Sequence, residues 1–389
     1  MTVRIPLAAP DITEAEIEAV TAVLRTSQLS LGPELEAFEK SLAEYHSVDH
    51  AVAVSSGTAG LHLALLALGV GKGDEVIIPS FAFIAVANAV VQVHATPVFA
   101  EIDPVSLNLD PASVERAITP HTRAILVVHT FGVPAEMDAL GAIARRHRLA
   151  ILEDACEAVG AQFGDPPAAR RAGSFGDLAV LGFYPNKQLT TGEGGAVLCR
   201  DAAYARRLRS LRNQGRSSDR DPLADAVESS PRSPDWLDHA EPGYNYRLAE
   251  MACALGRVQL SRLHEMLALR EAAAKRYDEL LADIPGLERP PVELPRRAIS
   301  WFVYAVRLPI DVDRNRVQSE LARQGVATGR YFPPIHLQPA WRGHASAALS
   351  LPVTEAVAPR MLALPFFNRI DPSRQREVAD ALRRAISPG

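Results

Sequence analysis

The feature that most constrains the fold is a repeated order of short apolar strands and helices. The apolar runs, which we expect to be strands, are residues 51–54, 75–79, 97–102, 124–129, 149–154, 178–183 and 196–199. Helices are expected between several of them, at about 58–69, 83–93, 111–118 and 136–147. Apolar strands that alternate with helices indicate an α/β fold with a mostly parallel sheet, covered by helices on both faces. Ligands bind such sheets at the carboxyl ends of the strands.

The pattern changes in the C-terminal part of the chain. There we expect one long helix over about 248–281, an alternating, half-exposed strand at 302–308, and helices at 314–324 and 373–386. We therefore predict a large α/β domain over residues 1–247 and a smaller α+β domain over residues 248–389. The polar segment 215–242, rich in Ser, Asp and Pro, is expected to be a mobile surface loop.

Composition argues against several classes of protein. A net charge of −5 over 389 residues gives no basic footprint for nucleic acid or for a membrane surface. The longest apolar stretch, 76–93, is interrupted by Pro79 and polar residues, and the N-terminus lacks a signal-peptide core. Cys156, Cys199 and Cys253 form neither a disulfide framework nor a metal-binding pattern. We expect a cytoplasmic protein with no metal, nucleic-acid or membrane partner.

Two polar groups follow the predicted strands. The turn 55–58 (SSGT) opens a helix, so it is either an ordinary helix cap or a site where free N–H groups and Gly57 receive a phosphate. Glu153 and Asp154 end the strand 149–154, and each is either a solvated loop carboxylate or a partly buried acid. A buried acid needs a cationic partner, because an unpaired buried charge is costly.

An aromatic pair and a lysine follow two more strands. Phe81 and Phe83 are either core residues or a ring surface for a planar cofactor. Lys187, in the segment GFYPNKQLTTGEGG, lies between an apolar run and a glycine cluster, so it is either a surface lysine or a desolvated amine. A phosphate cradle, an acid, an aromatic face and a lysine together meet the needs of pyridoxal phosphate.

These segments resemble the sugar aminotransferases of the DegT/DnrJ/EryC/StrS family, which belong to fold type I of the pyridoxal-phosphate enzymes (the aspartate-aminotransferase-like fold). The resemblance extends over nearly the whole chain, through LSLGPELEAFE, AVAVSSGTAGLHLALLALGVGKGDEVIIPSFAF, ILEDACEAVGA, GSFGDLAVLGFYPNKQLTTGEGG and GRYFPPIHLQPAW. Its most specific segments are NKQLTTGEGG and GYNYRLAE.

The resemblance implies roles for individual residues at the cofactor. Lys187 matches the lysine that bonds the cofactor's aldehyde, and Asp154 matches the acid that pairs with its ring nitrogen. Phe83 matches the aromatic residue that stacks on the ring, and Gly57 and Thr58 match the phosphate-binding turn.

Further matches and one departure complete the implied site. Glu157 stands where the family often has Gln or His near the cofactor's 3-hydroxyl. Asn245 matches an asparagine that reaches the phosphate from the neighbouring subunit, which implies a homodimer with shared active sites. Tyr331 and His336 match a segment close to the sugar. The family commonly has a serine that contacts the phosphate five residues before the lysine, whereas this chain has Gly182.

The implied activity is transfer of an amino group from L-glutamate, or glutamine, to a nucleotide-linked keto sugar in amino-sugar, polysaccharide or antibiotic biosynthesis. A keto-cyclitol acceptor is an alternative. So is a non-catalytic binding or regulatory protein that kept the fold. A sugar dehydratase on the same scaffold carries histidine at the lysine position, so Lys187 argues against it.

Overall fold

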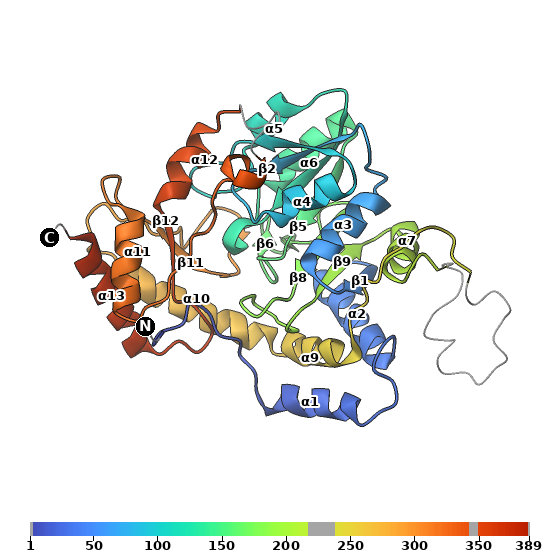
Figure 1. Ribbon diagram of the computed structural model, residues 1–389, viewed down its shortest axis with the longest axis horizontal. Coiled ribbons are helices and arrows are strands. Elements are labelled where there is room, and N and C mark those ends of the chain that lie inside the picture. Colours follow the sequence, from blue (N-terminus) through green and yellow to red (C-terminus); the bar gives the residue numbers. More distant parts are fainter. Residues whose placement is uncertain (1–2, 217–237, 342–348, 388–389) are drawn as a thin grey trace.

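The centre of the molecule is a seven-stranded sheet with the strand order β1-β9-β8-β5-β4-β2-β3 (Figure 1). The coordinates are a computed structural model that describes residues 3–216, 238–341 and 349–387. The strands are β1 (His50–Val54), β2 (Glu75–Pro79), β3 (Thr96–Ala100), β4 (Thr122–Val128), β5 (Ala150–Asp154), β8 (Leu178–Gly182) and β9 (Gly195–Cys199). The neighbours from β8 to β3 pair in parallel, and β9 is antiparallel to both β1 and β8. The predicted mostly parallel sheet is confirmed.

Helices cover both faces of the sheet because its strands are apolar on both sides. One face packs against α3 (Gly57–Ala67), α4 (Ala85–Gln92) and α7 (Ala202–Arg212). The other face packs against α2 (Pro33–His46), α5 (Pro111–Ala117), α6 (Met137–His147) and α9 (Glu250–Ser261). Alternate residues of one strand serve the two cores: Val52 and Val54 face α3, whereas Ala51 and Ala53 face α2.

The predicted long helix over 248–281 is wrong, because it is broken at Arg262 into α9 and α10 (Leu263–Leu280). The side chain of Arg262 bonds Glu16 at 2.5 Å and Asp11 at 3.4 Å, which ties the break to the N-terminal segment. That segment includes α1 (Glu14–Leu24), which begins with a capping box between Thr13 and Glu16.

The C-terminal part is built on a two-stranded antiparallel sheet of β11 (Tyr304–Arg307) and β12 (Met361–Leu364). Its helices are α11 (Arg314–Arg323), α12 (Pro352–Val357) and α13 (Pro372–Ile386), with the 3₁₀ turns Ile335–Leu337, Pro339–Trp341 and Ala358–Arg360. The strand β11 is buried rather than half-exposed, as its first three residues are at most 5% exposed. Residues from α10, α11 and α13 pack around this sheet in one core.

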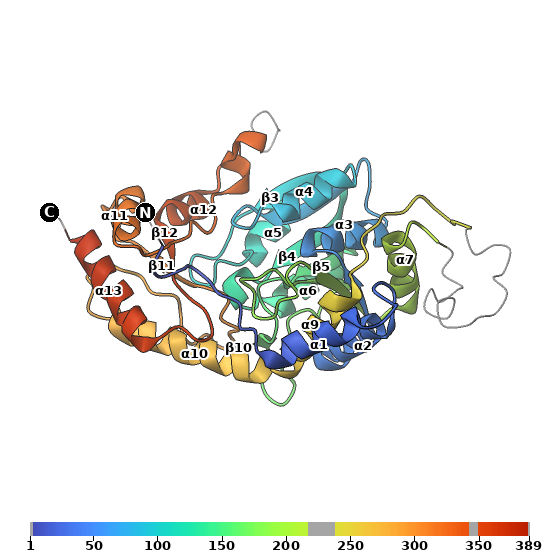
Figure 2. The ribbon, with the colours of Figure 1, turned by 60° about the horizontal axis from the view of Figure 1, so that its bottom comes forward.

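The N-terminus also contributes to this C-terminal core. Ile5 is fully buried there and pairs with Val326. A small sheet of β6 (Gln162–Phe163), β7 (Arg170–Arg171) and β10 (Arg297–Ala298) adds a second link between early and late segments. Figure 2 shows α10 extending from the large sheet's side to the C-terminal helices. The division of the chain at residue 247 therefore stays a prediction.

Two sequence-based expectations concern the surface of the molecule. Most of the loop expected at 215–242 lies outside the described residues. Among the described helices, none combines the length and apolar character that a membrane span requires.

Candidate active site

A cavity of about 480 Å³ lies at the carboxyl ends of the strands. The strands β1, β5 and β8 run in the same direction, so their carboxyl ends meet at one edge of the sheet. Seven of the residues predicted from the sequence to form the site line this cavity: Gly57, Thr58, Phe83, Asp154, Glu157, Lys187 and Tyr331. Gly182, the position of the expected serine, lines it as well.

One end of the cavity is the start of α3. Ser56 caps this helix, and its Oγ accepts a hydrogen bond from the N–H of Ala59 at 3.0 Å. The first N–H groups of a helix have no intrahelical acceptor and favour an anion. Gly57 and Thr58 therefore present a site suited to a phosphate group.

The side chain of Cys156 packs against the backbone of this turn. A Cβ atom added at Gly57 would lie 2.9 Å from Cys156 Sγ, and one added at Gly182 would lie 3.1 Å from both Cβ and Sγ of Cys156. Burial raises the pKa of the Cys156 thiol well above its usual value, so the sulfur stays protonated. Cys156 therefore occupies part of the space that a serine at position 182 would need.

Lys187 enters the cavity from a turn that follows β8. Its backbone N–H donates to the carbonyl of Tyr184 at 2.9 Å, which fixes the turn. Its Nζ atom lies 3.4 Å from Glu157 Oε1 and 4.0 Å from the centroid of the Phe302 ring. The side chain is 15% exposed. The amine is thus largely removed from water, and it has one carboxylate partner among the described residues.

Glu157 is held between Lys187 and the loop after β4. Its Oε2 atom accepts a hydrogen bond from the N–H of Phe131 at 3.0 Å. Phe131 lies in the 3₁₀ turn Thr130–Gly132 with a φ of 56°, a left-handed conformation that bulky residues rarely adopt. Burial raises the pKa of Glu157, although Lys187 and the Phe131 N–H oppose this effect. The carboxyl group is therefore suited to hold a proton.

Glu153 and Asp154 have different surroundings because consecutive strand residues point to opposite faces. Asp154 lines the cavity, and its Oδ1 accepts a hydrogen bond from the N–H of Cys156 at 3.0 Å. Glu153 is fully buried and accepts hydrogen bonds from His129 Nε2 at 2.8 Å and from the N–H groups of Gly173, Phe175 and Gly176.

The hydrogen-bond donors around Glu153 favour the ionised form of its carboxyl group. Burial alone would raise the pKa of this carboxyl group, but the hydrogen bonds from His129 and from the backbone outweigh burial and lower it. The interpretation of Glu153 as a solvated loop carboxylate is therefore wrong. Its role is to fix the loop 173–176, which leads directly into β8.

The two aromatic residues suggested by the sequence lie in different surroundings. Phe81 is fully buried in the core, whereas Phe83 is 61% exposed at the cavity and offers a ring surface for stacking. Sequence reasoning missed Phe302, which comes from a distant segment, and Asn186. The Oδ1 atom of Asn186 is buried without a hydrogen-bond partner among the described residues. Its position next to Lys187 was the only available signal.

Two predicted site residues lie away from the cavity of their own chain. His336 is buried, its Nδ1 lies 2.6 Å from Ser80 Oγ, and its Nε2 lies 3.4 Å from Glu355. Asn245 is exposed, and its backbone pairs with Asn213. Neither residue lines the cavity, so a single chain does not bring them to Lys187.

The residues that do converge fit pyridoxal phosphate. The start of α3 suits the phosphate group, Phe83 offers a ring surface, Asp154 offers a carboxylate and Lys187 offers an amine. Asn186 also lines the cavity, next to Lys187. Within residues 3–216, 238–341 and 349–387, no cluster of three or more His, Cys, Asp or Glu side chains is arranged to hold a metal ion.

Comparison with known sequences gives a consistent result. Residues 10–383 match the sequence model of the DegT/DnrJ/EryC1/StrS aminotransferase family. The chain is 41% identical to the dTDP-3-amino-3,4,6-trideoxy-α-D-glucose transaminase of Streptomyces venezuelae, over 98% of this chain and 96% of that protein. It is 39% identical to the GDP-perosamine synthase of Caulobacter vibrioides, over 86% of each chain.

Solved structures agree with this result. S. venezuelae DesV superposes with a TM-score of 0.86 at 39% identity, over 100% of both chains. Spr1654 of Streptococcus pneumoniae in its PLP form superposes with a TM-score of 0.88 at 25% identity, over 98% of both chains. The predicted aminotransferase-like fold is therefore confirmed.

Proposed function

The chain belongs to the DegT/DnrJ/EryC1/StrS family of sugar aminotransferases, which use pyridoxal phosphate, and we propose that its active site is the cavity around Lys187. The reaction moves an amino group from an amino acid to a nucleotide-linked keto sugar. The observation that carries this proposal is the convergence of Lys187, Asp154 and the start of α3 on one cavity.

Each cavity residue has a proposed task at the cofactor. Bound pyridoxal phosphate supplies an aldehyde that bonds amines and a ring that accepts the electrons released at the donor's α-carbon. Gly57 and Thr58 bind the phosphate, and Phe83 packs on the ring. Asp154 keeps a proton on the ring nitrogen, because a carboxylate beside that atom favours its cationic form.

Lys187 and Glu157 form the proposed proton-transfer pair. A lysine must be a free amine to act as a nucleophile, and Glu157 Oε1, 3.4 Å away, is placed to take the ammonium proton. The raised pKa of Glu157 suits it to keep that proton. The freed amine of Lys187 would then remove the proton from the donor's α-carbon. In the second half of the reaction it would deliver a proton to the acceptor carbon that receives the amino group, once the carbonyl oxygen of that carbon has left as water.

The proposed substrates follow from the family. L-Glutamate or glutamine is the amino donor. The two curated relatives are named for a dTDP sugar and for GDP-perosamine, so the acceptor is proposed as a class, a nucleotide-linked keto sugar. Tyr331, which lines the cavity on the side of the C-terminal part, is the proposed contact for the sugar.

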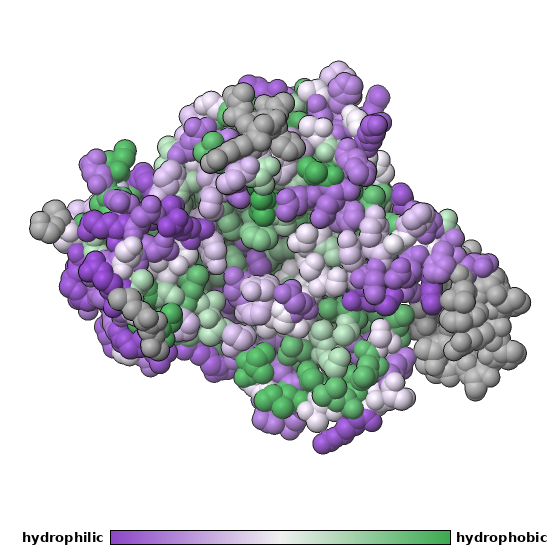
Figure 3. All heavy atoms as spheres, in the orientation of Figure 1, coloured by the Kyte–Doolittle hydropathy of each residue, from purple (hydrophilic) through white to green (hydrophobic). Residues whose placement is uncertain are grey.

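The active site is proposed to be completed by a second copy of the chain. Asn245 is exposed outside its own cavity, which suits a residue that reaches the phosphate of a partner. Figure 3 shows apolar side chains gathered over α1. Ile12, just before this helix, and Ile17 and Leu24 within it are 42–57% exposed. Such an exposed apolar patch favours association with another protein surface.

Mixed dimers test the shared site. Lys187→Ala and Asn245→Ala homodimers should each be strongly impaired, whereas dimers re-formed from both variants should regain roughly one quarter of the wild-type activity, because half of them carry one intact site. No recovery in demonstrably mixed dimers would show that Asn245 serves its own chain or no site.

A half-reaction tests the proposed activity directly. The protein is loaded with pyridoxamine phosphate, and nucleotide-linked keto sugars are added one at a time while the absorbance is followed. We expect at least one sugar to restore the aldehyde form of the cofactor, and glutamate to reverse the change. A protein that binds the cofactor and responds to neither amino acids nor keto sugars or cyclitols would be a binding protein instead.

A further inference from the structure

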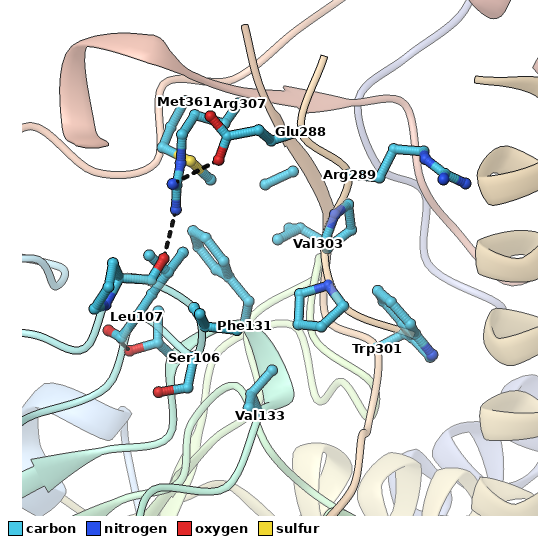
Figure 4. A pocket seen from close by; sticks show the side chains of 16 residues that line it. Ser106, Leu107, Phe131, Val133, Glu288, Arg289, Trp301, Val303, Arg307 and Met361 are labelled. Carbon is cyan, nitrogen blue, oxygen red and sulfur yellow. Dashed lines mark hydrogen bonds and ion pairs between the residues drawn. The ribbon is translucent and has the colours of Figure 1, made fainter. Parts of the chain in front are cut away.

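A second cavity, of about 280 Å³, lies behind the active site. We call it the Arg307 cavity (Figure 4). Its lining residues on one side are 104–107, Thr130, Phe131 and Val133, and those on the other are 288–291, Trp301, Val303, Ala305, Arg307 and Met361. It shares no lining residue with the active-site cavity. Neighbouring residues just before β11 separate the two, where the chain bends at Phe302. Trp301 and Val303 line the Arg307 cavity, whereas Phe302 lines the active-site cavity and lies against Lys187.

The walls of the Arg307 cavity are mostly apolar and held in place. Leu107 and Phe131 both adopt left-handed backbone conformations, with φ angles of 61° and 56°. Such conformations of bulky residues are costly and cluster at binding and catalytic sites. Asn108 fastens the two loops, because its Nδ2 donates to the carbonyl of Val133 and its Oδ1 accepts from the N–H of Thr130. The cavity is therefore a formed space rather than a loose gap.

At one end of the cavity, the described side chains carry more positive than negative charge. Arg307 donates to Glu288 at 2.7 Å and to the carbonyl of Pro104 at 2.7 Å. Arg360 binds the same Glu288 carboxylate at 2.6 Å, so two guanidinium groups share one negative charge. Arg289 does not add to this surplus, because it pairs with Asp278 at 2.5 Å. Burial lowers the pKa of Arg307, which means that its charge is poorly solvated.

The lining of the Arg307 cavity determines the charge and the size of a ligand that would fit it. Figure 4 shows Arg307 and Trp301 at opposite ends of the cavity, with Phe131 and Val303 between them. A ligand with one negative charge would balance the single surplus positive charge of the cavity. A phosphate monoester carries close to two negative charges, which is more than the cavity can balance. The volume lies just below the roughly 300–1,000 Å³ of sites for drug-sized ligands, which limits the apolar body to about one ring.

We propose that the Arg307 cavity is a second ligand site, which binds a small monocarboxylate with a compact apolar body. The carboxylate lies at Arg307, and the apolar body lies against Trp301 and Val303. The site is separate from the chemistry at Lys187, so the proposal goes beyond the aminotransferase activity and does not depend on which sugar is the acceptor.

Calorimetric titration of the cofactor-loaded protein tests the proposal, with phenylacetate as the probe and phenylacetamide as its uncharged match. We expect phenylacetate to bind at one site per chain, and phenylacetamide to bind at least about tenfold more weakly, since the charge-assisted contact is lost. Absence of phenylacetate binding, or equal binding of the two probes, overturns the proposal.

Two variants with opposite expected effects locate the site. Arg307→Gln should weaken phenylacetate binding by at least about tenfold, and Glu288→Gln should strengthen it by several-fold, because the second change frees both guanidinium groups. Loss of stability would weaken binding in both variants, so a gain in Glu288→Gln cannot arise from damage to the fold. If neither variant changes the affinity, phenylacetate binds elsewhere and the proposal is wrong.

Discussion

The contact between Gly182 and Cys156 makes a testable prediction about the phosphate cradle. Serine at position 182, the residue that the family resemblance implied, would place its Cβ 3.1 Å from Cβ and Sγ of Cys156. Contacts this close force side chains or backbone to move, and overpacking of this kind costs about 1–3 kcal/mol. We therefore expect Gly182→Ser alone to lower the free energy of unfolding of the apoprotein by about that amount.

The complementary substitution is at position 156, where alanine removes the sulfur atom. Cys156→Ala alone should cost about 1 kcal/mol, because it leaves a space the size of one methylene group. The double variant should be more stable than the sum of the two single effects by about 1 kcal/mol, since the contact with Sγ is removed whereas the contact with the Cβ of residue 156 remains. Urea unfolding of the four apoproteins, followed by tryptophan fluorescence, measures this coupling.

Cofactor retention gives a second measurement on the same four proteins. A serine hydroxyl that reaches the phosphate contributes about 1.5–3 kcal/mol, which corresponds to a roughly ten- to hundredfold lower dissociation constant in the double variant than in Cys156→Ala. If Gly182→Ser is as stable as the wild type, or if the two changes are additive, Cys156 does not occupy the position of the serine and the reasoning is refuted.

Three further predictions concern single side chains of the site. Lys187→Ala should abolish turnover and the borohydride-stable label on the peptide 183–191, whereas a label that persists on another lysine would exclude Lys187 as the bonding amine. Glu153→Gln should lower the free energy of unfolding by about 3–5 kcal/mol at pH 7, since a buried acceptor of four hydrogen bonds loses its charge. The lowered pKa of Glu153 adds stability above the unfolded-state pKa of 4.5, and that stability is lost as the pH falls through the lower folded-state value, so urea unfolding at pH 7 and in acid should show the difference shrinking. Glu157→Gln should slow the formation of the Lys187–cofactor bond in stopped-flow absorbance at neutral pH and regain the wild-type rate as the pH rises, when solvent can take the ammonium proton; an unchanged rate at all pH values would remove Glu157 from the proton transfer.

The strands were predictable because their residues are apolar on both faces. Each of the seven predicted central strands matches an observed one to within two residues at either end, since a buried parallel strand has no alternating polar face to confuse the pattern. Because ligands bind such sheets at the carboxyl ends of the strands, the sequence indicated Gly57 and Lys187 as well as the pairs Phe81/Phe83 and Glu153/Asp154. The family resemblance then selected Phe83 and Asp154, and both line the cavity.

The errors have a common cause in contacts between distant segments. The break between α9 and α10 follows from bonds of Arg262 to Asp11 and Glu16, which no local pattern indicates. The burial of β11 results from packing against α10 and α13. Glu153 was ambiguous for the same reason, because three of its donors lie about twenty residues later in the chain.

The short segment 301–303, just before β11, contributes neighbouring residues to two different cavities. Trp301 and Val303 shape one, and Phe302 lies against the amine of Lys187 in the other. An insertion of one residue before this segment would move each side chain by one position, which would place the indole of Trp301 where Phe302 now faces the lysine. Chimeras that join related chains near residue 300 therefore affect both cavities at once, and their junctions have to preserve the spacing of residues 301–303 as well as their identity.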